Sequence, residues 1–146
     1  MEKAIGRFVS ILYRQSQVYF NHALKEFDIT SAEYALLLYL YKKDEISQED
    51  LSAYLYIDKA AIARAVKSLE QKGYVTRYKD EADKRFNRVC LSDKAKGLEN
   101  EIKEKVWSWS EFLTEDLDEE TVDEVLSVLK KMVNKVAGTN FKKRME

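Results

Sequence analysis

The sequence contains no proline and only four glycines. Because these two residues most often interrupt regular structure, their scarcity predicts long helices. Cysteine and histidine each occur once, as Cys90 and His22. A single cysteine excludes an internal disulfide, and Cys and His nowhere share the spacing of a zinc site. We therefore expect a reducing compartment and no metal ion.

Long apolar runs are also missing. The longest, from Ala35 to Tyr41, is far shorter than the roughly 20 residues that a membrane-spanning helix needs. The N-terminus, with Glu2 and Lys3, lacks the apolar segment of a signal peptide. The composition, 45% hydrophobic and 35% charged residues over 146 positions, is that of one globular domain. We therefore expect a cytoplasmic protein without membrane contact.

The sequence also lacks the motifs of a catalytic site. The chain has no glycine-rich phosphate loop, and no Ser or Cys is accompanied by a matched base. The acids between Glu115 and Glu120 surround a predicted helix break, where hydration and the helix dipole account for them. We therefore expect no catalytic residue, no cofactor and no enzymatic activity.

What the sequence does contain is a strongly patterned segment from Ile57 to Leu91. Asp58 suits the N-cap of a helix that runs to Lys72 and stops at Gly73. Its apolar stripe leaves the opposite face small and basic, with Lys59, Ala60, Ala63, Arg64 and Lys67 off that stripe. Two β-prone segments follow, residues 74–79 and 87–91, which predicts a hairpin whose charged tip, residues 80–85, is hydrated.

This segment concentrates positive charge. From Asp58 to Leu91 there are nine Lys or Arg against five Asp or Glu, although the whole chain has a net charge of −1. Small side chains let a helix approach the bases of DNA, and Arg64 and Lys67 can reach guanine edges or phosphates in the major groove. The segment therefore favours binding to double-stranded DNA.

The motifs of this segment resemble the winged helix-turn-helix core of the MarR family of bacterial transcription regulators. The family pattern L-E-x-K-G, L-V-x-R and D-x-R is met by residues 69–73, by Tyr74-Val75-Thr76-Arg77 and by Asp83-Lys84-Arg85. The sequence departs from it at Ala60, Ala61 and Ala63, where members often carry Ser or Thr. The resemblance implies that Arg85 enters the minor groove.

The flanking residues predict further helices. One runs from about Lys3 to Phe27, a second from about Ser31 to Lys43 behind a Thr30–Glu33 capping box, and a short third from a Ser47 cap to near Tyr56. After a Ser92 cap one long helix is predicted through Leu113, and a break at Leu117-Asp118 starts the last helix.

The N- and C-terminal helices are amphipathic and have no sheet of their own to cover, so we expect a homodimer, as the resemblance also implies. The expected fold is mainly α with a small β-hairpin wing. It is a single MarR-like domain, residues 1–146, with a winged helix-turn-helix over about 29–92 and dimerisation helices over about 1–28 and 93–146. A monomeric helical layer is the alternative.

The predicted DNA contacts combine base readers with groups that hold phosphates at helix N-termini. They are Ser47, Gln48, Lys59, Ala60, Ala61, Arg64, Lys67, Arg77, Lys84, Arg85 and Arg88. For Arg77 and Arg88, surface salt bridges are an equal alternative. Asp83 is expected to orient a neighbouring arginine.

Relatives in the family often bind small aromatic acids, and aromatic walls with a cation would suit such an effector here. The candidates are Tyr13, Arg14, His22, Tyr34, Trp107 and Trp109, with core packing as the competing interpretation. Cys90 is expected to be an inert strand residue. The predicted function is a dimeric regulator, most simply a repressor, of a pseudo-palindromic operator; the alternative is a winged module that binds a protein instead of DNA.

Overall fold

A computed structural model describes residues 4–145 of the chain. The elements follow in the order α1 (Ile5–Ala23), the 3-10 turn η1 (Lys25–Phe27), α2 (Tyr34–Lys42), β1 (Ile46–Ser47), α3 (Gln48–Leu55), α4 (Lys59–Gln71), β2 (Val75–Lys79), β3 (Asn87–Leu91), α5 (Asp93–Gly97), α6 (Glu99–Thr114), α7 (Glu119–Ala137) and α8 (Phe141–Met145). The chain divides within α6 into two compact units, one ending at Trp109 and the other beginning at Ser110.

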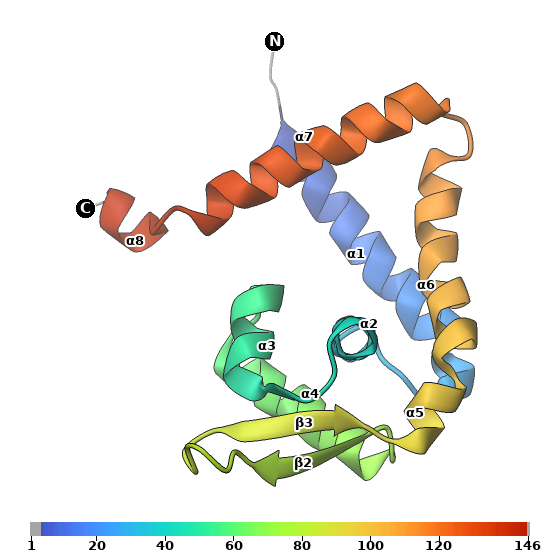
Figure 1. Ribbon diagram of the computed structural model, residues 1–146. Helices are drawn as coiled ribbons and strands as arrows, with labels where there is room; N and C mark the ends of the chain where they lie inside the picture. Colours follow the sequence, from blue (N-terminus) through green and yellow to red (C-terminus); the bar gives the residue numbers. More distant parts are fainter. Residues whose placement is uncertain (1–3, 146) are drawn as a thin grey trace. The chain divides into compact units, whose positions relative to one another are not determined.

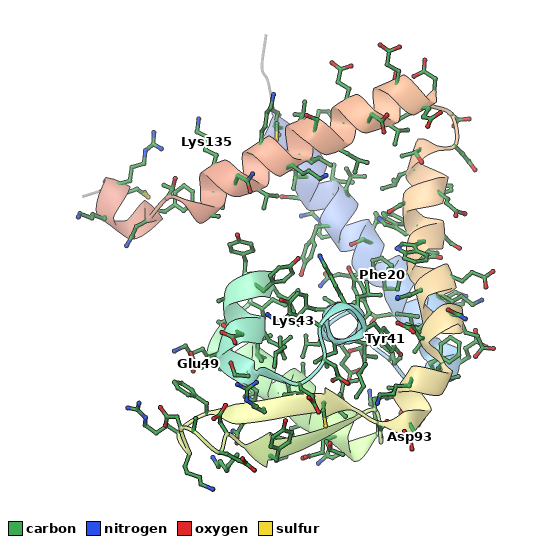
Figure 2. The ribbon with its side chains drawn as sticks, in the orientation of Figure 1. Phe20, Tyr41, Lys43, Glu49, Asp93 and Lys135 are labelled. Atoms are coloured by element: carbon green, nitrogen blue, oxygen red, sulfur yellow. The ribbon has the colours of Figure 1, made fainter. Side chains whose placement is uncertain are left out.

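The first unit has one hydrophobic core, with α2 almost end-on at its centre in Figure 1. Phe20 of α1, labelled in Figure 2, packs on Tyr34 of α2 with ring centroids 4.1 Å apart. α3 lies beside α4, and the β2–β3 hairpin lies against α4. The core is built mainly from fully buried aliphatic side chains, among them Leu24, Ile29, Leu36, Leu37, Leu40, Leu51, Ile62, Val66, Leu69, Val89 and Ile102.

The sheet has three antiparallel strands in the order β1-β3-β2. The predicted hairpin is confirmed, with Val75 opposite Leu91 and Lys79 opposite Asn87. The short strand β1 was not predicted: Ile46 pairs with Val89, and Ser47 pairs with Arg88. Two residues are too few to show the alternation by which a strand is identified from sequence.

The helix predicted from about Lys3 to Phe27 is observed as α1 followed by the turn η1, and Lys3 lies outside the described residues. The chain leaves the helix at Leu24, which is completely buried. Asp28 then takes a left-handed conformation, with φ of 57°. This sharp turn brings Ile29 into the core ahead of α2.

The second helix begins at Tyr34, three residues later than the predicted Ser31. The Thr30–Glu33 pair does form, because Glu33 Oε1 accepts from both the backbone N–H and the hydroxyl of Thr30, each at 2.9 Å. Since the Thr30 hydroxyl donates to the carboxylate, it does not cap a backbone N–H group, and residues 31–33 form a turn instead of a helical start.

The single long helix predicted after Ser92 is wrong. The cap itself is confirmed, since the Ser92 hydroxyl accepts from the N–H of Ala95 at 3.2 Å. The helix is interrupted at Leu98, between α5 and α6. Tyr41, labelled in Figure 2, donates to the carbonyl of Ala95 at 2.6 Å. Gly97, a poor helix former, precedes the interruption and lowers its cost.

The second unit contains the end of α6 and the helices α7 and α8. The predicted start of α7 is confirmed by its N-cap, Asp118, which accepts from the N–H of Thr121 at 2.8 Å. In the described part of the chain α7 buries none of its residues, although it carries a continuous apolar stripe. The short helix α8 was not predicted.

Candidate nucleic-acid interface

The helix expected to face DNA is α4, and its first turn is fixed as predicted. The Asp58 carboxylate accepts from the N–H of Ala61 at 2.8 Å, which satisfies one of the free donors at the helix start. Ile62, Val66 and Leu69 are completely buried. The helix is therefore held by its apolar face and by its cap, and the opposite face stays open.

That open face contains Ala60, Arg64 and Lys67, all exposed, with Ala61 and Ala63 half-buried at its edges. Within the described residues, neither Arg64 nor Lys67 has a hydrogen-bonding or ion-pair partner. Because the alanines add little bulk, the helix backbone can approach another molecule closely. Two free cations beside small side chains suit contact with base edges and phosphates.

The far end of α4 is anchored to the turn η1 and to the start of α2. Gly73 follows the helix with φ of 82°, a conformation that glycine adopts without strain. The hydroxyl of the buried Tyr74 donates to the carbonyl of Phe27. Lys72 Nζ lies 2.8 Å from Glu33 Oε1. The orientation of α4 is thus set from both ends.

The start of α3 lies next to the start of α4. The Ser47 hydroxyl is the N-cap of α3 and accepts from the N–H of Asp50 at 3.0 Å. Ser47 is buried, and Gln48 beside it is half-buried. The Lys59 ammonium lies 2.8 Å from the carboxylate of Glu49, which is labelled in Figure 2. Of the cations on the α4 face, Lys59 is therefore already paired.

The wing tip presents Lys84 and Arg85, both exposed. Arg85 forms a fork with Asp83, in which Nε donates to Oδ1 at 2.9 Å and Nη2 donates to Oδ2 at 2.6 Å. The hydrogen bond from Arg85 lowers the pKa of Asp83, and the same contact raises the pKa of Arg85. The expectation that Asp83 orients a neighbouring arginine is confirmed.

The tip, residues 80–85, was predicted to be hydrated, and Asp80 is the exception because it is buried. Its Oδ1 accepts from the N–H groups of Ala82 and Asp83, and its Oδ2 accepts from Arg88 Nε. The hydrogen bond from Arg88 lowers the pKa of Asp80. Asp80 was not singled out from the sequence, since nothing local distinguishes it from the other acids of the tip.

Arg77 and Arg88, on the two strands of the hairpin, both have partners. Arg77 Nη2 lies 3.6 Å from the Glu70 carboxylate. Arg88 contacts Asp80, and its Nη1 also donates to the carbonyl of Glu45 at 2.7 Å. The salt-bridge alternative raised from the sequence is therefore realised for both side chains in the free protein.

A separate cavity of about 440 Å³ lies between α1, the start of α2 and the α3–α4 connection. Of the predicted effector residues it brings together Tyr13 and Tyr34, while Arg14, His22 and Trp107 do not line it. Trp109 packs on Tyr19, with ring centroids 5.4 Å apart. The lining is uncharged: Tyr13, Ser16, Gln17, Phe20, Ser31, Ala32, Tyr34, Ala35, Leu36, Leu55, Tyr56, Ile57 and Ala61.

Cys90 lies in β3 opposite Thr76, whose Oγ1 is 2.8 Å from the sulfur, and it is half-buried. Across residues 4–145 no group of three or more His, Cys, Asp or Glu side chains could hold a metal ion. Over the same residues, no helix is long and apolar enough to cross a membrane.

The helices α3 and α4, each with its cap, and the β2–β3 hairpin beside α4 define a winged helix-turn-helix domain, as Figure 1 shows. The sequence profile of the MarR family matches residues 27–85. The chain is 34% identical over 115 residues to the HTH-type transcriptional regulator SarZ of Staphylococcus saprophyticus, covering 77% of this chain and 75% of the relative.

Solved structures of MarR proteins have the same fold as this chain. A MarR transcriptional regulator from Methanosarcina mazei Go1 is 38% identical and superposes with a TM-score of 0.87, covering 92% of this chain and 96% of its own. A mutant MarR from E. coli, complexed with operator DNA, is 25% identical with a TM-score of 0.79, covering 89% and 94%. The chain therefore belongs to the MarR family of DNA-binding transcription regulators.

Proposed function

We propose that this protein is a homodimeric repressor that binds a pseudo-palindromic operator through two copies of α4. The observation that carries the proposal is the open face of α4, where Arg64 and Lys67 have no partner among the described residues. In a two-fold dimer the two recognition helices would enter successive major grooves, about one helical turn apart. Occupying the operator would then exclude the transcription machinery.

The proposed dimer is supported by apolar surface that a single chain leaves uncovered. Ile5, Phe8 and Val9 of α1 are each more than half exposed. In α7, Leu126 and Val133 are about half exposed, at 50% and 52%. Large apolar side chains exposed along a helix in this way support an interface on each of the two helices. We assign dimerisation to residues of about 1–28 and 93–146, and DNA binding to about 29–92.

We assign the DNA contacts from where each side chain lies and from whether it already has a partner in the free protein. Arg64 reads a base, Lys67 holds a phosphate or a guanine edge, and the exposed Ala60 with its neighbour Ala61 allows close approach. Lys84 and Arg85 place the wing in the adjacent minor groove. The N-termini of α3 and α4, with Ser47, Gln48 and Lys59, hold phosphates, because backbone N–H groups and the helix dipole attract anions.

We also propose that a small aromatic effector binds in the cavity between α1, α2 and the α3–α4 connection. Its volume suits a small molecule, and its walls combine aromatic rings with the hydroxyls of Tyr13, Tyr34 and Tyr56. Because no charged side chain lines it, an uncharged aromatic compound fits better than an acid. Ala61, in the first turn of α4, also lines it, so an occupant would touch the recognition helix.

Two measurements test the proposal. Selection of the tightest binders from random genomic duplex fragments should yield a pseudo-palindromic site, and sedimentation at micromolar concentration should show a dimer. A monomer at that concentration would remove the dimer. Failure to bind any duplex at low salt would instead support a winged module that docks on a protein. A cytoplasmic location follows from the proposed DNA partner.

A further inference from the structure

The guanidinium of Arg88 joins the tip of the wing to the loop before β1. Arg88 Nε donates to Asp80 Oδ2 at 2.5 Å, and Arg88 Nη1 donates to the backbone carbonyl of Glu45 at 2.7 Å. Asp80 is at the start of the wing tip, whereas Glu45 precedes β1, 43 residues away from Arg88 in sequence. Arginine can bond two acceptors in different directions because its planar head carries five donors.

On the wing side, this contact continues to the proposed minor-groove residue. The Asp80 carboxylate accepts from the N–H groups of Ala82 at 2.8 Å and Asp83 at 3.1 Å, which shapes the turn at the tip. Asp83 in turn holds the guanidinium of Arg85. The chain of contacts from Arg88 to Arg85 therefore sets where Arg85 points.

On the other side, the contact reaches the start of α3. Asp44 Oδ1 accepts from the N–H of Leu91 at 2.9 Å, so the loop that carries Glu45 is bonded to β3. Ser47 pairs with Arg88 in the sheet and caps α3. Since α3 packs against α4, the wing tip is linked through Arg88 to the recognition helix.

We propose that Arg88 and Asp80 are positioning residues that brace the wing against the helix-turn-helix, and that Arg88 does not itself contact DNA. This inference rests on the proposed function, because it concerns how the wing meets the operator. β1 pairs with residues 88 and 89 of β3, so the wing beyond Arg88 has two strands, and a two-stranded hairpin alone is marginally stable. A brace that orders the tip before binding removes part of the ordering cost that Arg85 would otherwise add to association.

A double-mutant cycle separates bracing from direct contact. Arg88→Ala and Arg88→Lys are each measured with Arg85 present and with Arg85→Ala, using the selected operator. We expect both Arg88 variants to lower affinity by at least fivefold with Arg85 present, and by less than twofold in the Arg85→Ala background. An equal loss in both backgrounds, or full affinity of Arg88→Lys, would show that Arg88 acts through its charge on DNA.

DNA footprinting distinguishes loss of the wing contact from a general loss of stability. In Arg88→Lys, guanine N7 protection in the major groove should persist, while protection of the flanking minor groove from hydroxyl radicals should be lost. Arg77→Ala is the matched control, because Arg77 is an arginine of the same hairpin whose carboxylate partner is Glu70 of α4 and not a residue of the wing tip. It should retain the minor-groove protection. Parallel loss of both footprints in Arg88→Lys would overturn the brace.

Hydrogen exchange tests the brace without DNA. The amides of Ala82 and Asp83 should exchange at least tenfold faster in Arg88→Lys than in the parent protein, as roughly expected when a hydrogen-bonded network to a charged group is lost. They should be unchanged in Arg77→Ala. Unchanged exchange in Arg88→Lys overturns the brace alone. A parent protein that binds no duplex overturns the proposed function and, with it, the role of the wing.

Discussion

Lys72 Nζ lies 2.8 Å from Glu33 Oε1, so an ion pair ties the end of the recognition helix to the start of α2. The Glu33 side chain is only 3% exposed and that of Lys72 is 21% exposed. A buried carboxylate needs several donors to replace water, and Glu33 also accepts from the N–H and the hydroxyl of Thr30. The pair therefore holds α4 in its orientation at little cost in unsatisfied charge.

Removing one partner of this pair should destabilise the fold. Glu33→Gln leaves the largely buried Lys72 ammonium with only the exposed Asp28 carboxylate, 3.9 Å away, and we expect a loss of about 3 kcal/mol in the free energy of unfolding. Urea denaturation measures it. The double variant Glu33→Gln with Lys72→Met should lose less, because it leaves no unpaired charge. Equal losses in the single and double variants would contradict this role of the pair.

The same carboxylate predicts a dependence of stability on pH. Burial alone would raise the pKa of Glu33, but hydrogen bonds from Lys72, Ser68 and Thr30 together outweigh burial and lower the pKa below the ordinary value of a glutamate. A lowered native pKa means that folding favours the carboxylate. Its contribution to the free energy of unfolding is therefore complete above the pKa that Glu33 has in the unfolded chain. That contribution is lost as the pH falls through the pKa of the native state. Urea denaturation of the parent protein and Glu33→Gln between about pH 3 and 7 should show a smaller acid-induced loss in the variant.

The cap of the recognition helix should contribute to stability measurably. Asp58→Ala removes the acceptor for the N–H of Ala61, and we expect a loss of about 1 kcal/mol in the free energy of unfolding. Asp58→Asn, which keeps a capping oxygen, should lose much less. Thermal unfolding of the three proteins at one concentration gives the comparison, and identical stability of Asp58→Ala and the parent protein would show that the cap is dispensable.

Arg64 should discriminate between bases. Arg64→Ala is expected to cost roughly 1–3 kcal/mol in operator binding and to relax the preference at one base pair of each half-site. Replacing the guanine at that position by 7-deazaguanine should weaken operator binding by the parent protein. It should not change binding by Arg64→Ala, because that variant does not use the N7 acceptor. If the variant keeps the full sequence preference of the parent protein, Arg64 is not a reader.

Cys90 should not act as a redox switch. It is half-buried in β3 beside the Thr76 hydroxyl, and it is the single cysteine of the chain. Treatment with hydrogen peroxide should leave operator affinity within a factor of about two, within the uncertainty of such measurements. Cys90→Ser controls for oxidation elsewhere. Loss of binding by the parent protein but not by Cys90→Ser would overturn this assignment.

The local chemistry of this chain was predictable from its sequence, and the long-range contacts were not. Ser47, Asp58 and Ser92 cap helices as expected, because a cap depends on a side chain and the N–H groups two or three residues later. At the interruption at Leu98, by contrast, the Ala95 carbonyl accepts from Tyr41, which is 54 residues away in sequence. No periodicity within one helix reveals such a contact.

In the candidate interface too, local features were predictable from the sequence and long-range contacts were not. The basic face of α4 and the charged tip follow from spacing and composition. Spacing and composition do not show which cations already have a partner in the folded chain. Lys59 pairs with Glu49 on another helix, and Arg88 donates to the carbonyl of Glu45. The sequence predicted DNA contacts for Lys59, Arg64 and Lys67 alike, and left salt bridges open for Arg77 and Arg88. The structure leaves Arg64 and Lys67 as the free cations of the described α4 face.

The most direct test of the account is a salt titration of binding to duplex DNA, with Arg64→Ala, Lys67→Ala and Arg85→Ala measured beside the parent protein. We expect a steep fall of affinity with salt, because neutralised phosphates release counterions, and a shallower slope wherever a variant loses a phosphate contact. Binding that is absent at low salt, or equal in the parent protein and all three variants, would contradict the assignment of α4 and the wing as the DNA-binding surface.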